Sequence, residues 1–200
     1  MAVVSGGTTL IDNGALDAGV PSGSLVLLST QTASASASIE FTSGIDSTYD
    51  NYVFKFINIH PQTDNVTFQM NFSTDNGSNY NVTKTTTYWR AYHDESDTGA
   101  NIDYQVAQDL AQSTSDQPIA QQCGNDNDQN TSGMLHLYNP SSTTYVKHFL
   151  AKSNHTTENN YNLNIFVAGY ANTTSAINAI IFRMSSGNID DGIIKMYGVK

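Results

Sequence analysis

The sequence predicts an all-β protein: an antiparallel β-sandwich or jelly roll with an extended N-terminal arm and at most one or two short helices. Tyr and Phe, with 11 and 8 copies, suit a pleated sheet, as do the many Thr and Val residues. Asn, Ser and Gly are abundant and suit turns. Charged residues make up only 13% of the chain, so the Lys, Arg and Glu that usually fill helical surfaces are scarce.

Each expected strand is a short apolar or alternating segment followed by turn residues, and roughly nine such segments at this spacing are typical of a sandwich or jelly roll. The clearest is Asn65–Phe72, in which every second side chain is apolar. Asn76 and Gly77 then favour a tight turn, which predicts a β-hairpin over residues 65–93. The expected strands are Leu25–Thr30, Tyr52–Ile59, Asn65–Phe72, Tyr80–His93, Met134–Tyr138, Tyr145–Lys152, Tyr161–Ala171, Ile177–Met184 and Gly192–Val199.

The alternation also predicts which side chains fill the space between the two sheets. In Tyr52–Ile59 it places Phe54 and Phe56 on one face and Ile57 and Ile59 on the other. The core that this pattern predicts consists mainly of Phe54, Phe56, Val66, Phe68, Met70, Phe72, Phe149, Ile165, Val167 and Ile181.

Residues 1–23 are small, Gly-rich and weakly patterned, which predicts an N-terminal arm ahead of a β-sandwich domain at 24–200. One short strand is expected in the arm, around Thr8–Ile11. Such an arm either lies on its own domain or docks on a partner subunit, and we predict contact with another chain. The small-residue stretch Ala33–Ser38 is either a flexible hinge or an edge strand.

Residues 94–131 are the least regular part of the domain. Ile102, Val106 and Leu110 follow one another at intervals of four, which predicts one short helix. Gly124–Ser132 is a polar loop. Because long irregular insertions on a β framework usually carry recognition, we expect this region to be a distal binding loop.

Charge excludes several classes of partner. The 8 Lys and Arg residues against 18 Asp and Glu residues give a net charge of -10, whereas nucleic-acid binders need clustered cations. The apolar runs are too short for membrane insertion. The single cysteine, Cys123, precludes an internal disulfide, and the residues after Met1 lack the pattern of a signal peptide, so we expect no Sec export.

No motif predicts catalysis, a metal site or a cofactor. His136 and His148 fall in expected neighbouring strands, but no HxH or HExxH spacing occurs. The acidic cluster of His93, Asp94, Glu95 and Asp97 lies in an expected loop, where nothing raises one carboxyl pKa as glycoside hydrolysis requires. Asp126, Asp128 and Asn130 have the spacing of calcium ligands, but Thr131 and Leu137 replace the glycine and glutamate of an EF-hand. We expect a protein that is not an enzyme, with weak calcium binding by the acidic loops left open.

Aromatic residues beside these polar loops point to a sugar ligand. Tyr and Trp offer flat faces for stacking, and Asn and Asp bond sugar hydroxyls, although large side chains packing under a long loop would leave the same pattern. A weak site of this kind gains from an oligomer. The candidate ligand-binding residues are Tyr88, Trp89, Tyr92, Tyr104, Asn101, Asn125, Asp126 and Asp128.

Four segments carry a resemblance to known proteins: Ser36–Pro61 (SASIEFTSGIDSTYDNYVFKFINIHP), Asp75–Thr85 (DNGSNYNVTKT), Leu135–His148 (LHLYNPSSTTYVKH) and Phe182–Gly198 (FRMSSGNIDDGIIKMYG). Together they resemble structural proteins of the virions of marine tailed bacteriophages. The last segment also resembles the closing hairpin of phage jelly-roll modules. The resemblance covers most of the chain from about residue 25 onward and brings no catalytic motif.

The resemblance implies a non-catalytic virion protein that is assembled in the host cytoplasm. It implies a homo-oligomer, often a trimer, that contacts other virion proteins through the arm. We favour a tail fibre or tail-associated component facing host glycans. A capsid decoration protein that clamps coat subunits is the alternative, and a glycan depolymerase is a remote third reading that would need two facing carboxylates in a cleft.

Overall fold

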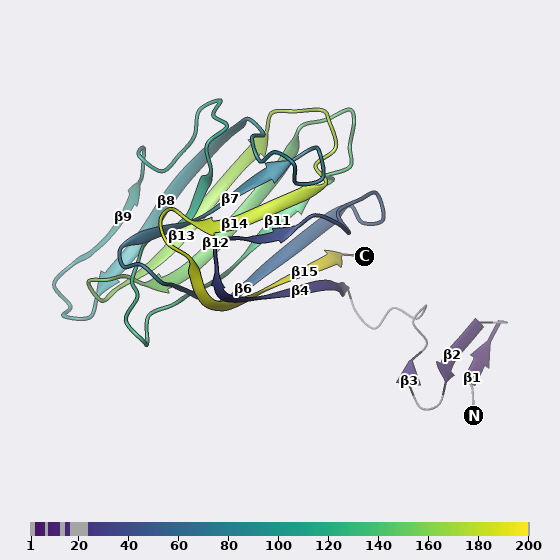
Figure 1. The fold of residues 1–200 in the computed structure, drawn as a ribbon, viewed down its shortest axis with the longest axis horizontal. Coiled ribbons are helices and arrows are strands. Elements are labelled where there is room, and N and C mark those ends of the chain that lie inside the picture. Colours follow the sequence, from purple (N-terminus) through teal and green to yellow (C-terminus); the bar gives the residue numbers. More distant parts are fainter. Residues whose placement is uncertain (1–2, 7, 13–14, 17–23, 200) are drawn as a thin grey trace.

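The computed structural model describes residues 3–6, 8–12, 15–16 and 24–199. Within these ranges, all of the regular secondary structure is β-strand (Figure 1). The all-β prediction is therefore confirmed for the described residues. The strands are β1 (Val3–Ser5), β2 (Thr8–Asp12), β3 (Ala15–Leu16), β4 (Leu25–Ser36), β5 (Ile39–Phe41), β6 (Asn51–Pro61), β7 (Val66–Ser73), β8 (Lys84–Asp94), β9 (Ala100–Tyr104), β10 (Gln117–Cys123), β11 (Thr131–Tyr138), β12 (Lys147–Thr156), β13 (Tyr161–Ala171), β14 (Ala179–Met184) and β15 (Ile189–Val199).

Two antiparallel sheets form the sandwich. The larger has eight strands in the order β4-β15-β6-β11-β12-β13-β8-β9, and the smaller has four in the order β10-β7-β14-β5. Strands β1, β2 and β3 form a separate three-stranded sheet. We call the side of the eight-stranded sheet that faces the smaller sheet its inner face. The β-sandwich is confirmed, while the jelly-roll connectivity stays a prediction.

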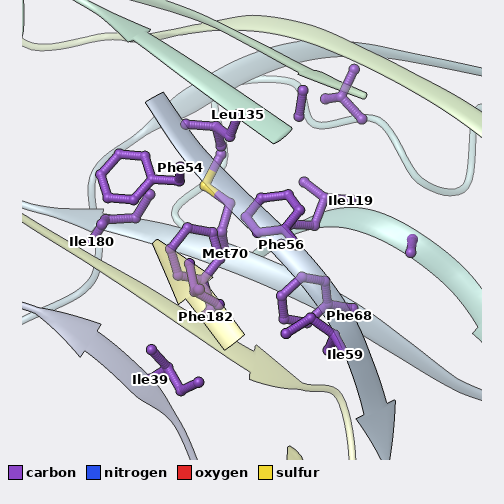
Figure 2. Packing of buried hydrophobic residues seen from close by; sticks show 14 of the residues in the cluster. Ile39, Phe54, Phe56, Ile59, Phe68, Met70, Ile119, Leu135, Ile180 and Phe182 are labelled. Carbon is purple, nitrogen blue, oxygen red and sulfur yellow. The ribbon is translucent and has the colours of Figure 1, made fainter. Parts of the chain in front are cut away.

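Phenylalanine rings fill the space between the sheets (Figure 2). Phe56 of β6 lies 5.5 Å from Phe68 of β7 and 5.3 Å from Phe182 of β14, measured between ring centroids. All predicted core residues are buried. Ile181, however, pairs with Asn71 and so lies on the opposite side of the four-stranded sheet from Phe182, outside the core cluster.

Two predictions about connections and local structure are wrong. Residues 65–93 do not form a hairpin, because β7 belongs to the four-stranded sheet and β8 to the eight-stranded one. The turn at Asn76 and Gly77 is present, with φ of 58° and 87°, but it leads from one sheet to the other. The helix expected from Ile102, Val106 and Leu110 is also absent: Ile102 lies in β9, and Val106 is 78% exposed.

A β-bulge explains the wrong face for Ile59. Asn58 has a φ of 52°, and the pairing of β6 with both neighbouring strands shifts at this position. The extra residue turns Ile59 back to the inner face, where it is fully buried in the core. Gly192 of β15 lies opposite, and a Cβ atom there would approach the Asn58 carbonyl to 2.8 Å.

The N-terminal region contains the one expected strand and two others, β1 and β3, which the sequence did not predict. β2 contains the strand predicted around Thr8–Ile11. Other parts of the predicted arm, namely residues 1–2, 7, 13–14 and 17–23, lie outside the described residues. The small-residue stretch Ala33–Ser38 is largely an edge strand, because β4 runs to Ser36 and pairs with β15.

Strand register brings several connections together at one end of the sandwich, which we call the loop end. Pro61 lies opposite Ile189, Thr131 opposite His155, and Tyr161 opposite Asp94. The connections at these strand ends are residues 62–65, 95–99, 124–130, 157–160 and 185–188. The start of β4 and the end of β15 lie at the other end, on the right in Figure 1.

Truncating Phe68 tests the packing between the sheets. Its side chain is fully buried, so Phe68→Ala should lower the free energy of unfolding by about 3–5 kcal/mol in denaturant titrations. Tyr145→Ala is the control because Tyr145 is 71% exposed, and its effect should stay within about 0.5 kcal/mol. Similar effects of the two substitutions would contradict the assigned core.

His155 adds a pH-sensitive group to the same core. Its Nε2 atom lies 2.6 Å from the carbonyl oxygen of Gln121 and donates to it, while Nδ1 is buried without a partner. Burial lowers the pKa of His155 to about 4. Protonation would place an unsatisfied N–H and a charge in the apolar core, so the neutral ring is the form that the fold accepts.

Acid should therefore destabilise the protein through His155. Because the pKa is lower in the folded state than its unfolded value of about 6.5, the cost begins as pH falls below 6.5 and reaches roughly 3 kcal/mol near pH 4. His155→Gln should flatten the slope of unfolding free energy against pH in this window. His148→Gln, at an exposed position, should leave the slope unchanged. Equal slopes for wild type and His155→Gln would refute this assignment.

Candidate functional site

A pocket of about 300 Å³ opens at the loop end; we call it the end pocket. The four-stranded sheet ends at β10, so the inner face of β8 beyond it is not covered by another strand of that sheet. Side chains from β8, β10, β13 and the 157–160 connection surround the resulting hollow. They are Arg90, Tyr92, Gln122, Thr157, Asn159, Tyr161 and Leu163.

Two tyrosines form the aromatic part of the end pocket. The rings of Tyr92 and Tyr161 meet edge to face, with centroids 5.8 Å apart and an interplanar angle of 68°. The guanidinium carbon of Arg90 lies 5.1 Å from the centroid of the Tyr92 ring. Both tyrosines are half-buried, and both line the pocket.

The charge of Arg90 is balanced inside the protein. Its Nε donates to Asp103 Oδ1 at 3.0 Å, and its Nη2 lies 3.4 Å from Asp103 Oδ2. Nη1 donates to Gln122 Oε1 at 3.2 Å. A two-point contact with a carboxylate fixes the orientation of the guanidinium. The pocket therefore offers polar groups in fixed directions with little net charge.

The acidic cluster predicted around Asp94 is a self-contained turn. Asp94 accepts hydrogen bonds from the Ser96 and Thr98 hydroxyls, both at 2.6 Å, and from the backbone N–H of Gly99 at 2.9 Å. The Ser96 and Thr98 bonds are the main reason that the pKa of Asp94 lies below its usual range. The carboxylate is thus committed to shaping the 95–99 connection.

This turn borders a second hollow of about 390 Å³ that shares Asn159 and Tyr161 with the end pocket. Its other lining residues are Asp94, Glu95, Ser96, Thr98 and Asn160. Tyr161 thus stands between two adjoining depressions, which together form an extended surface suited to a ligand of several units.

The 124–130 connection supports the same end. Buried Gln129 accepts from the backbone N–H of Asp126 at 3.2 Å and donates to Asn160 Oδ1 at 3.2 Å. Asn125 is half-buried and bonds to the 62–65 connection, whereas Asp126 and Asp128 are exposed. Among the described residues, no group of three or more His, Cys, Asp or Glu side chains could hold a metal ion.

The eight residues predicted from the sequence do not form one site. Tyr92 lines the end pocket, and Asn101 is exposed opposite it on β9. Tyr88 is fully buried in the core, where its ring cannot touch a ligand. Trp89 and Tyr104 lie opposite each other on β8 and β9, and they face the outer side of the eight-stranded sheet because side chains alternate along a strand.

Trp89 belongs to a different depression, which we call the outer groove. Its ring stacks on Phe166 at 4.1 Å with an interplanar angle of 7°. The groove has a volume of about 350 Å³, and Trp89, Met134 and Leu150 in it are 38%, 40% and 50% exposed. It is more apolar than the end pocket.

Sequence reasoning missed most of the end pocket, namely Arg90, Gln122, Thr157, Asn159, Tyr161 and Leu163. Alternation along β8 would have placed Arg90 on the same face as Tyr92. Tyr161 and Leu163 lie beside Tyr92 only because β13 pairs with β8, and a single strand pattern does not reveal that pairing.

Comparisons with protein-family models, curated proteins and solved structures found no match for the chain. In the ranges that the structure describes, no helix is long and apolar enough to cross a membrane.

Proposed function

We propose that this chain is a non-catalytic virion protein of a tailed phage, a tail fibre or tail-associated component whose loop end binds neutral host glycans. The observation that carries the ligand part is the end pocket: two tyrosine faces, amide and hydroxyl groups, and an arginine already neutralised by Asp103. The virion part rests on the sequence resemblance and on the composition.

A neutral sugar fits this chemistry better than an anion. Tyr92 and Tyr161 are half-buried and line the pocket, where an aromatic ring can stack on the C–H side of a pyranose. Gln122 and Asn159 can both donate to and accept from sugar hydroxyls. An anionic sugar would compete with Asp103 for Arg90 and would meet a protein of net charge -10.

Binding without turnover is the reading that the pocket supports. Glycoside hydrolysis uses two carboxyl groups on opposite sides of the scissile bond. The residues that line the end pocket include no carboxylate, and Asp103 beside it is engaged by Arg90. The adjoining hollow is lined by Asp94 and Glu95, and Asp94 is engaged by the 95–99 turn, which leaves one carboxylate rather than a facing pair. Release of reducing ends from host polysaccharide by the purified protein would contradict this reading.

The arm and the loop end lie at opposite ends of the domain, which supports an outward-facing loop end. The arm enters at the start of β4, at the end opposite the 95–99, 124–130 and 157–160 connections. An arm held by other virion proteins would leave the loop end free for the host surface. Weak binding at each copy would then gain from several copies on one particle.

The outer groove favours a second candidate function, capsid decoration. Exposed Trp89, Met134 and Leu150 form an apolar depression of the kind that suits contact with another protein. In this alternative, the outer face of the eight-stranded sheet would lie against coat subunits on the phage head.

Removing an end-pocket ring should weaken sugar binding. Tyr161→Ala should reduce affinity for neutral glucan, mannan or galactan oligosaccharides by about tenfold, measured by ligand-detected NMR or calorimetry, because stacking area is lost. Tyr161→Phe should retain most of the affinity, since the ring face remains. Both variants should stay folded, because Tyr161 is only half-buried.

Trp89→Ala is the matched aromatic control on the opposite face of the sheet, and it should leave affinity unchanged. A loss of binding with Trp89→Ala but not with Tyr161→Ala would indicate that sugar binds in the outer groove instead of the end pocket. Wild-type protein that binds none of these neutral sugars would count against the end pocket as a glycan site.

Deleting residues 1–23 tests the arm. Of the residues in this segment whose side chains the structure describes, none belongs to the β-sandwich core, so the truncated protein should stay folded by circular dichroism. It should no longer enter particles in an assembly or complementation assay, because its contacts with other virion proteins are lost. Normal incorporation, or complete unfolding of the truncated chain, would disprove the role assigned to the arm.

A further inference from the structure

Strand β4 is an unusually open edge of the larger sheet. Among the described residues it pairs only with β15, so the backbone N–H and C=O groups on its other side have no strand partner. Side chains reach two backbone groups near its end: the Ser34 N–H donates to Ser36 Oγ, and the Ala35 carbonyl accepts from Asn188 Nδ2. Its sequence, LVLLSTQTASAS, contains no charged residue and no proline over 12 residues. Long edge strands without such features are templates for pairing with another chain.

The other three edges of the sandwich carry features that discourage pairing. β9 has 5 residues and includes Asp103, and β5 has 3 residues and includes Glu40. β10 contains Pro118, and its pairing with β7 shifts register twice. Charge, proline, irregularity and short length are the usual protections of a sheet edge. β4 alone lacks these protections along its central part.

We propose that β4 pairs antiparallel with β4 of a second copy of this chain, joining two eight-stranded sheets across a two-fold axis. An isologous contact brings the same surface from both copies together. For a chain of net charge -10 such a contact is ordinarily opposed by repulsion, and the absence of charge along β4 removes that obstacle locally.

The flanking charges favour the antiparallel direction. Asp191 of β15 lies opposite Ser34, and Asp190 precedes it, so both carboxylates flank one end of β4. Antiparallel pairing places this end of one copy beside the far end of the other, around Leu27. Parallel pairing would bring the four carboxylates of two copies together, which is unfavourable.

The regular part of β4 defines where pairing would occur. Ser29–Ser34 follows β15 without a break in register, from Met196 to Asp191. A shift beside Leu28 and a φ of 48° at Ala35 bound this segment on either side. Leu27, which is 53% exposed, lies just outside it and would be partly covered by the partner.

This contact is independent of the proposed sugar site. β4 and β9 are the two opposite edges of the eight-stranded sheet, and the end pocket lies on the β8 and β13 side. Pairing through β4 therefore leaves both end pockets open. Failure of sugar binding and failure of pairing would be observed separately.

Sedimentation velocity of the full chain from about 1 to 100 μM tests the proposal directly. We expect a species with the mass of two copies, and slowed amide hydrogen exchange in Ser29–Ser34 as it forms. Thr32→Lys places a charge on the outer side of β4 and should raise the dissociation constant at least about tenfold. Ile102→Lys, on edge strand β9, is the matched control and should have no effect.

Gln31→Lys is a second variant in case Thr32→Lys fails to fold, and circular dichroism verifies both. A single-copy mass at every concentration would overturn the proposal. A mass of three copies would also overturn it and would agree with the trimer that the sequence resemblance implies. A two-copy species that is unaffected by the folded Lys variants would show that another surface makes the contact.

Discussion

Phe182 is the residue on which the sandwich depends. Its ring lies between the two sheets, with centroids 5.3 to 6.4 Å from the rings of Phe41, Phe54, Phe56 and Phe68. This layer holds β6 against β7 and β14 and sets the spacing of the sheets. Strand register then brings the 95–99, 124–130 and 157–160 connections to one end, where the end pocket forms.

The sequence predicts much of this fold because side chains alternate along a strand. The alternation from Val66 to Phe72 matches the buried face of β7, and Tyr161–Ala171 matches β13 in full. The same alternation does not indicate which strands pair with each other. The turn at Gly77 looks like a hairpin turn, yet the strands on either side belong to different sheets. Likewise, the bulge at Asn58 reverses the direction of Ile59 without an obvious sequence signal.

The sequence predicts only part of the candidate site, and alternation along β8 separates two of the residues that it suggests. Tyr88 and Trp89 are consecutive in a strand, so they face opposite sides and cannot belong to one binding surface. By contrast, the contact between Tyr92 and Tyr161 joins residues from β8 and β13, far apart in the chain. Only the register of these strands brings them together, and alternation within one strand cannot reveal it.

We propose opposite roles for the two ends of the domain: attachment where the arm enters β4, and recognition at the loop end around Tyr161. Cryo-electron microscopy of the assembled particle tests the orientation of the domain most directly. We expect density for the domain on the tail, with the start of β4 toward the particle and the 95–99 and 157–160 connections toward solvent. A domain on the head with the outer groove against coat subunits, or a loop end buried against another virion protein, would contradict this proposal.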